Sequence, residues 1–462
     1  MEIELPDVPL VKIFSYLDAL SLLQASQVSK GWNKVAESDL LWRRMCLKKW
    51  HFCNFTYEHL GTQTWKQLFL HQTKQEHRMA CAQPEDFIYK EAAGNLGILG
   101  PVAYVSGSRF TLDEQGKSII CIVSSMRKLY TWDVQEGTMI WSSPVQQFNI
   151  TNLETLPQMH LEITADMGEN KWNCRDRDPL ATCAMAQICF SLNAFLTKDG
   201  PFLMVGDSDG NIHTFTIPEL RDISEVHAFQ HSIDILHCSP DKKWVFSCGI
   251  HQHIFSKVGA IFFTECLLRP SEHSTPLYFT LPFASCNRGC WTPRRKNGIT
   301  LMYRRGSTKK TGFTTFDLTT ESPEAHQIAS FLLPVHIDSP NWMGVSDGSI
   351  IVVESGPYLF LFTINGLMLE RCEGHQSIIS NIWVDSLHIL AASMDCSLHV
   401  YMWEEGGYYP YLKKCCHLEY LGNSLTPSCS QVSRAICDNM SIVRVVSRAH
   451  ESNILVINIL NV

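Results

Sequence analysis

The sequence predicts an α+β multidomain protein with a small all-α N-terminal domain, a helical linker and an all-β propeller of seven or eight blades. Three observations lead to this prediction. Apolar residues in the first 50 positions recur at three- and four-residue spacing, the period of one helix face. A second helical pattern starts near residue 64, and from about residue 100 short β-rich runs alternate with Gly, Asp, Asn and Pro. We expect domains over 1–50, 51–95 and 96–462.

Four short helices are expected in the N-terminal domain, each with its own start signal. Asp7 can cap the first helix and either Asp18 or Ser21 the second, while Ser29 and Ser38 precede the third and fourth. Apolar side chains line all four helices, yet about 45 residues is close to the size at which a single core becomes marginal. The segment therefore predicts a second protein that covers part of its apolar surface.

A set of residues in this segment stands in a fixed order without gaps, namely Leu5-Pro6, Ile13 to Asp18, Leu20, Leu22-Leu23, Val28, Lys30, Trp32-Asn33 and Leu41-Trp42. These residues, in this order, resemble an F-box. Two positions depart from the pattern: Val8 replaces an acid that often stands there, and Gly31 costs a presumed helix about 1 kcal/mol relative to Ala. The resemblance implies binding to the Skp adaptor of SCF (Skp, cullin, F-box) ubiquitin ligases, and through it to the cullin and the RING subunit.

The resemblance also implies which residues contact the adaptor. The matching positions are Leu5, Pro6, Ile13, Leu17, Leu20, Val28 and Trp32. The alternative is that all of them are core residues of an ordinary helical domain. The number of positions that match in order favours the F-box.

A helix from Thr64 to Met79 is expected to connect the two domains. Trp65, Leu68 and Phe69 share one of its faces with Gln72. F-box proteins with a propeller commonly place a rigid helical linker here. The alternative is a helix packed on the propeller, and the two can hold together.

The remaining chain carries one recurring strand roughly every 40 to 55 residues, which is the period of propeller blades. These strands are marked by residues 130–133, 171–173, 214–216, 262–264, 315–317, 360–362, 400–403 and 456–458. Eight marks are consistent with seven or eight blades.

Several of these residues resemble degenerate WD repeats. Trp132-Asp133 ends a strand, Gly374-His375 resembles the family's repeat opener, and Asp209 and Asp395 stand in tight turns. In the family, such an acid belongs to a hydrogen-bonded network inside one blade. The resemblance implies that His375, Ser393, Asp395 and Tyr401 fill those places here.

Composition and charge restrict the remaining classes of function. With 38 basic and 46 acidic residues, a net charge of −8 argues against a general nucleic-acid binder. The 18 cysteines are scattered, which favours reduced thiols over a disulfide scaffold. The N-terminal residues lack the pattern of a signal peptide, and the apolar runs are too short for a membrane span. We expect a cytoplasmic protein, with a nuclear location as the alternative, and no membrane contact.

Signals for catalysis and for metal binding are weak. His375, Ser393 and Asp395 could suggest a catalytic triad, but no nucleophile motif surrounds Ser393. Zinc sites could be suggested from Cys286, Cys290 and His273, or from Cys248, His251 and His253, but the spacings match no zinc motif. We expect no catalytic residues, no cofactor and no metal.

Basic residues that could bind a target gather around one presumed strand. The candidates are Arg304, Arg305, Lys309 and Lys310. Three interpretations are open, namely recognition of a phosphorylated peptide, an ordinary solvated charge cluster, and a nuclear signal at residues 293–296. The target itself is not evident from the sequence.

Together these features predict the substrate-recognition subunit of an SCF ubiquitin ligase. Such a subunit binds the Skp adaptor through its F-box and target proteins through its propeller, which promotes their ubiquitination and degradation without catalytic groups of its own. The alternative is a non-degradative propeller scaffold with a relic F-box. An enzyme would need a pocket with perturbed titratable groups, which the sequence does not announce.

Overall fold

The computed structural model describes most of the chain. The described residues are 7–49, 63–92, 96–107, 117–166, 171–175, 179–251, 256–269, 278–281, 286–292, 297–305, 310–319, 325–346, 348–385, 387–404, 408–420, 431–447 and 453–461. The chain forms two compact units, one of residues 1–79 with 111–116 and one of residues 80–110 with 117–462.

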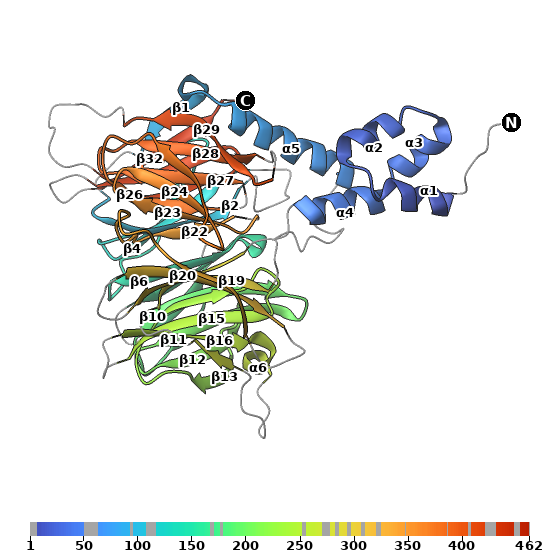
Figure 1. Cartoon of the computed structure of the whole chain (residues 1–462). Helices are drawn as coiled ribbons and strands as arrows, with labels where there is room; N and C mark the ends of the chain where they lie inside the picture. The colour runs from blue at the N-terminus through green and yellow to red at the C-terminus, as the bar shows by residue number, and fades with distance from the viewer. Residues whose placement is uncertain are drawn as a thin grey trace. The chain divides into compact units, whose positions relative to one another are not determined.

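The first unit is helical (Figure 1). Its helices are α1 (Asp7–Phe14), α2 (Ala19–Ala25), α3 (Lys30–Ala36), α4 (Asp39–Lys49) and most of α5 (Trp65–Cys81). Two of the predicted caps, Asp18 and Ser29, are found at the starts of α2 and α3. Asp18 accepts a 2.7 Å hydrogen bond from the Ser21 amide, and Ser29 accepts one of 3.2 Å from the Trp32 amide.

One core holds the first unit together, and α5 is part of it. Trp65, Leu68 and Phe69 of α5 pack with buried residues of α1 to α4. The Trp42 ring lies 5.5 Å from the Phe69 ring, and its indole N–H donates to the Ala36 carbonyl at 2.7 Å. The apolar face predicted for this helix is thus buried against the F-box helices, which makes α5 an extension of the F-box core.

Eight four-stranded antiparallel sheets form the second unit within the described residues. The first three, in chain order, are β2 (Leu99–Ser106) with β3 (Ile119–Ser124), β4 (Lys128–Asp133) and β5 (Thr138–Ser142); β6 (Ile150–Leu156) with β7 (Leu161–Asp166), β8 (Lys171–Arg175) and β9 (Pro179–Ala184); and β10 (Cys189–Thr197) with β11 (Gly200–Asp207), β12 (Asn211–Thr216) and β13 (Asp222–His227). The next three are β14 (Ile233–Cys238) with β15 (Trp244–His251), β16 (Ser256–Phe263) and β17 (Tyr278–Thr280); β18 (Cys286–Trp291) with β19 (Gly298–Arg305), β20 (Lys310–Leu318) and β21 (Ala325–Leu332); and β22 (Met343–Val345) with β23 (Ile350–Ser355), β24 (Tyr358–Thr363) and β25 (Met368–Glu373).

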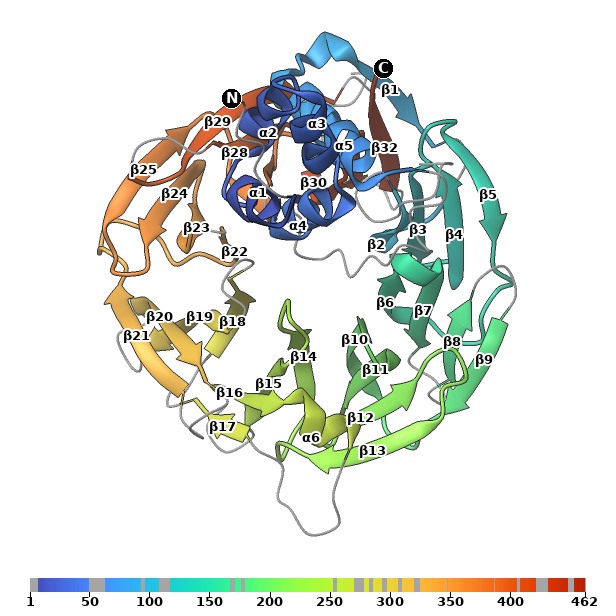
Figure 2. The ribbon, with the colours of Figure 1, turned by 90° about the vertical axis from the view of Figure 1, so that its right-hand side faces the viewer.

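The two remaining sheets complete the ring that Figure 2 shows. They are β26 (Ile379–Val384) with β27 (His388–Ser393), β28 (Leu398–Glu404) and β29 (Tyr411–Leu418), and β30 (Gln431–Cys437) with β31 (Ser441–Ser447), β32 (Asn453–Leu460) and β1 (Phe87–Glu91). Short helical segments join some elements, namely η2 (Pro84–Asp86), η3 (Pro157–Met159) and α6 (Thr264–Leu268). The predicted propeller is confirmed, with each sheet forming one blade.

Each of the eight recurring strands predicted from the sequence lies on the third strand of a different blade. These are β4, β8, β12, β16, β20, β24, β28 and β32. Strands inside a blade are covered on both faces by neighbouring blades, so their sequences are almost continuously apolar. In β23, for example, all six residues are buried.

The ring is closed by strands from distant parts of the chain. β1 pairs with β32, from Phe87 opposite Leu460 to Glu91 opposite Val456. In the other seven sheets the four strands are consecutive in sequence. Closure therefore depends on main-chain hydrogen bonds that join residues near 90 to residues near 458.

Candidate adaptor-binding surface

The F-box helices leave several large apolar side chains exposed. These residues are Val8, Ile13, Tyr16, Leu20, Val28 and Leu40, with exposed fractions from 49% for Ile13 to 81% for Val8. Large apolar residues exposed this densely on so small a unit are typical of an interaction site.

The pattern on α1 explains why these side chains face outward. Leu10 and Phe14, four residues apart, lie on the buried side of the helix. Phe14 contacts Trp32 with ring centroids 5.3 Å apart in an edge-to-face arrangement. Ile13 lies next to this buried stripe, and Val8 is on the outer side. The unit thus has a core of its own beneath an apolar surface.

Leu20, near the start of α2, is another exposed apolar residue of the F-box helices. Asp18 caps the helix, and hydrogen bonds from Ser21 lower the pKa of its carboxyl group. Leu20 falls in the first turn and is exposed, whereas Leu22 is fully buried. A charged cap therefore stands directly beside an exposed leucine.

The seven residues predicted to bind the adaptor fall into three groups. Ile13, Leu20 and Val28 are exposed. Leu17 and Trp32 are partly buried and pack against the core at its edge. Leu5 and Pro6 lie outside the described residues.

The sequence analysis missed three members of this surface. Val8 was noted only as a departure from the family pattern, and Tyr16 and Leu40 were not considered as binding residues. The ammonium group of Lys12 lies 5.5 Å from the centre of the Tyr16 ring, which is the distance of a cation–π contact.

The basic residues predicted to bind a target are brought together only in part. Arg305 pairs with Lys310 and Arg304 with Thr311 across the hairpin of β19 and β20. The side chains of Arg304 and Lys310 are exposed. Lys309 and residues 294–296 lie outside the described part of the chain.

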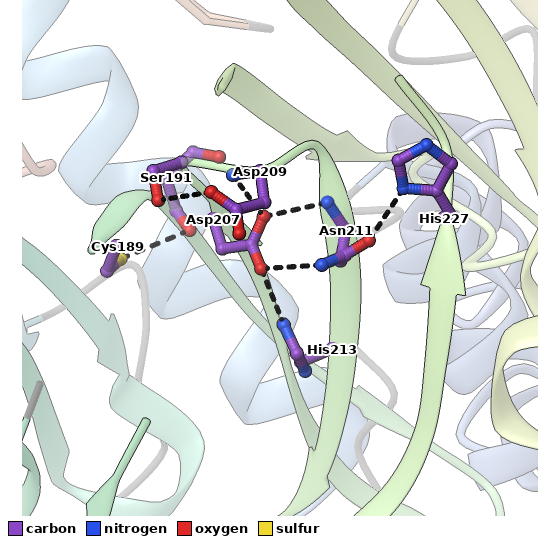
Figure 3. Close-up of polar contacts among 8 residues, drawn as sticks. Cys189, Ser191, Asp207, Asp209, Asn211, His213 and His227 are labelled. Atoms are coloured by element: carbon purple, nitrogen blue, oxygen red, sulfur yellow. Dashed lines mark hydrogen bonds and ion pairs between the residues drawn. The ribbon is translucent and has the colours of Figure 1, made fainter. Parts of the chain in front are cut away.

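A blade network of the expected kind is present at the turn between β11 and β12 (Figure 3). Its acid is Asp207, which is fully buried, and not Asp209, which is exposed. One Asp207 oxygen accepts from the amides of Asp209 at 2.9 Å and Asn211 at 2.7 Å, and the other lies 2.9 Å from Nε2 of His213. Burial alone would raise the pKa of Asp207, but these hydrogen bonds lower it overall.

The network predicted in the blade of β26 to β29 is only partly formed. Ser393 donates a hydrogen bond to Asp395, and the Ser397 amide donates to the same carboxylate at 2.9 Å. Neither ring nitrogen of His375 has a hydrogen-bond partner within the described residues. His375 instead lies against His399, with ring centroids 3.9 Å apart. The prediction was correct for the serine and the acid and wrong for the histidine.

The same contacts argue against a catalytic triad of His375, Ser393 and Asp395. The Ser393 hydroxyl contacts Asp395 and Ser397, so it does not form the nucleophile-to-histidine hydrogen bond that a triad requires. The cysteines considered for zinc contact main-chain carbonyls. Cys248 donates to the Cys286 carbonyl at 3.3 Å, and Cys290 to the Met343 carbonyl at 3.5 Å.

Comparison with known proteins agrees with the order of the two units. An F-box-like family model matches residues 3–48. The human F-box/WD repeat-containing protein 12 is 55% identical over 470 aligned residues, which cover all of both chains. The chain belongs to the F-box/WD repeat family. Mouse F-box/WD repeat-containing protein 15 is 40% identical over 97% of this chain and 96% of its own length.

Two further matches cover only part of the F-box/WD repeat chain. A probable E3 ubiquitin ligase complex SCF subunit, sconB of Talaromyces marneffei, is 52% identical over 40 residues, which are 9% of this chain and 6% of that protein. Sqt1 from Chaetomium thermophilum matches in structure with a TM-score of 0.59 at 12% identity, over 80% of this chain and 99% of its own. That match supports the propeller fold alone. No helix among the described residues is long and apolar enough to cross a membrane.

Proposed function

We propose that this chain is the substrate-recognition subunit of an SCF ubiquitin ligase. Its F-box would bind the Skp adaptor, and through it the cullin and the RING subunit, while the propeller would bind the target protein. The observation that carries the proposal is the set of apolar side chains exposed on the F-box helices above a separate core. The F-box/WD repeat relatives and the SCF subunit named above support the same assignment.

The energetics of this surface favour a partner. Full burial of a leucine or valine side chain stabilises by about 1.5–3 kcal/mol. Leu20 and Val28, at 66% and 63% exposed, would regain much of that free energy when a second protein covers them. An ordinary helical domain, the alternative, would bury these residues in its own core.

The role proposed for the propeller requires binding only. A receptor that holds a target near the ubiquitin-carrying enzyme acts by raising effective concentration, with no chemical group of its own. For the target, a phosphorylated peptide remains a hypothesis, supported by the exposed Arg304 and Lys310 near one end of the β19–β20 hairpin. We infer a cytoplasmic or nuclear location from this role.

Co-purification of the full chain with the Skp adaptor and cullin tests the proposal. A variant with Ile13→Asp and Leu20→Asp places two charges on the exposed surface and leaves the buried core unchanged. We expect it to lose adaptor binding by about 100-fold or more, because each substitution at the centre of an interface costs about 2 kcal/mol. Val335→Asp is the matched control, since Val335 is 86% exposed but lies in the propeller.

Point substitutions are preferable to removal of residues 1–50. Such a deletion would uncover Trp65 and Phe69 of α5, which pack in the F-box core. Adaptor binding by the double variant at wild-type strength would overturn the proposed surface. Adaptor binding by the wild type without recruitment of cullin would favour the alternative, a non-degradative scaffold.

A further inference from the structure

Three side chains with metal-binding atoms meet where two neighbouring blades adjoin. Asp385, His388 and Cys437 each place one such atom within 4.8 Å of the other two. Asp385 lies in the turn between β26 and β27, and His388 is the first residue of β27. Cys437 is the last residue of β30, in the blade that closes the ring.

The turn holds Asp385 in a defined orientation. Its Oδ1 accepts from the amides of Leu387 at 2.6 Å and His388 at 2.7 Å. Its Oδ2 lies 3.4 Å from Nδ1 of His388, beyond the usual range for an N–H···O hydrogen bond. One oxygen therefore fixes the turn, and the other faces the imidazole ring.

His388 provides an independent indication of a ligand. Its side chain is fully buried, and Nε2 has no hydrogen-bond partner within the described residues. An imidazole nitrogen buried in this way costs about 1–3 kcal/mol. One nitrogen of this imidazole lies within 4.8 Å of the Cys437 Sγ and of an Asp385 oxygen, the two atoms with which it would share a metal ion.

We propose that Asp385, His388 and Cys437 bind one Zn²⁺ ion, with water as the fourth ligand. Zinc accepts this mixture of oxygen, nitrogen and sulfur, whereas Ca²⁺ and Mg²⁺ prefer oxygen alone. Zinc–ligand distances of about 2.0–2.3 Å place tetrahedral ligands roughly 3.3–3.8 Å apart, so groups that lie within 4.8 Å of one another need to approach by about 1.5 Å at most. Binding converts the Cys437 thiol to a thiolate and releases its proton to solvent.

The ion would join the blade of β26–β29 to the blade that contains β1 and β32. Such a crosslink would fix β30, at the opposite edge of that blade from β1, to the preceding blade and so stabilise the closed ring. Sequence spacing could not reveal this set, because about 50 residues separate His388 from Cys437 and the two lie in different blades.

The test is metal binding by the purified full chain, measured as zinc content after dialysis and by titration with Co²⁺ as a spectroscopic probe. The variants are Cys437→Ser and His388→Gln. Cys416→Ser is the matched control, because Cys416 is a buried thiol in β29 of the same sheet as His388. The chain has 18 cysteines, so the difference between wild type and each variant is the informative quantity.

We expect one zinc ion per wild-type chain and a thiolate-to-cobalt absorption band that Cys437→Ser removes. His388→Gln should weaken binding by at least about tenfold, and Cys416→Ser should leave it unchanged. If either variant fails to fold, X-ray absorption of the zinc-loaded wild type decides, with one sulfur and otherwise nitrogen or oxygen ligands expected. Absence of stoichiometric zinc, a shell with two or more sulfurs or none, or equal loss in Cys416→Ser would overturn the proposal.

Discussion

The turn between β11 and β12 and the turn between β27 and β28 share a backbone design but treat a buried histidine differently. In the first, His213 lies 2.9 Å from the Asp207 carboxylate. In the second, the corresponding residue is His399, which follows Ser393 by the same six positions and has no hydrogen-bond partner at either nitrogen within the described residues. The two turns differ in that Ser393 stands where the first turn has Asp207. His213 therefore has a carboxylate partner, whereas His399 does not.

The second turn compensates through contact between imidazole rings. His399 lies between His375 and His417, with ring centroids 3.9 Å and 4.3 Å away. Burial is the main cause that lowers the pKa of His399 to about 3 and that of His375 to about 4. The neutral rings pack well, but a proton on either would be buried beside other imidazoles. The comparison shows that two blades of one ring can differ in their response to pH.

The largest effect is expected when the first turn loses its acid. Asp207→Ala removes the acceptor for two backbone amides, the Asn211 side chain and His213, and leaves buried donors without partners. We expect a loss of about 4 kcal/mol in the free energy of unfolding, measured by urea denaturation of the full chain. Asp209→Ala is the control, because within the described part of the chain that exposed side chain bonds only to its neighbour Ser208. Equal losses in both variants would contradict the assignment of the network to Asp207.

A smaller effect is expected from the residue at the tip of each turn. Gly210 and Cys396 occupy equivalent positions, with φ values of +88° and +65°. A Cβ at Gly210 would lie 2.0 Å from the Phe229 carbonyl oxygen, so Gly210→Ala must displace backbone. We expect a loss of about 3 kcal/mol, against less than about 1 kcal/mol for Cys396→Ala. Thermal unfolding of both variants measures these losses in stability. If Gly210→Ala is no more destabilising than Cys396→Ala, the two turns have equal room for a side chain.

The smallest effect is expected from a single histidine at acid pH. The folded-state pKa values of His375 and His399 lie below the ordinary value of 6.5, so the unfolded chain binds protons that the folded chain does not. The stability that these neutral rings provide is complete above about pH 6.5 and declines as pH falls toward 4. The decline is about 1.4 kcal/mol per pH unit for each histidine, or about 2 kcal/mol each at pH 5.

Urea denaturation at pH 7 and pH 5 measures this dependence. His399→Gln should reduce the difference between the two pH values by about 2 kcal/mol, while the Asp209→Ala control should keep the wild-type difference. If the stability of His399→Gln differs between pH 7 and pH 5 as much as that of the wild type, the His399 ring is not the source of the acid sensitivity.

The sequence predicted the propeller strands well because their signal is local. A third strand such as β24 (Tyr358–Thr363) is apolar on both faces, whatever its distant neighbours are. The linker helix was predicted over Thr64–Met79 and extends over Trp65–Cys81, but its packing partner was not evident from one apolar face. Periodicity identifies a face that is buried without identifying what buries it.

The sites were harder to predict for related reasons. Helical spacing places Ile13 in one stripe with Leu10 and Phe14, although Ile13 is exposed and the others are buried. Spacing alone cannot separate a buried face from an exposed one, and the prediction that Ile13 contacts a partner came only from the resemblance to the F-box. The motif indicates Asp209 in the turn, whereas the network acid, Asp207, is the last residue of β11.

The pairing of β1 with β32 also has a consequence for synthesis on the ribosome. When the ribosome has synthesised α1 to α5, about 370 residues remain to be added before β32 is reached. At translation rates of about 5–20 residues per second, the ring stays open for roughly 20–75 s after the F-box helices have emerged. During that interval the unpaired edge of β1 is exposed on the nascent chain, while the F-box can already fold. The order of the two units along the chain thus presents the F-box before a closed propeller exists.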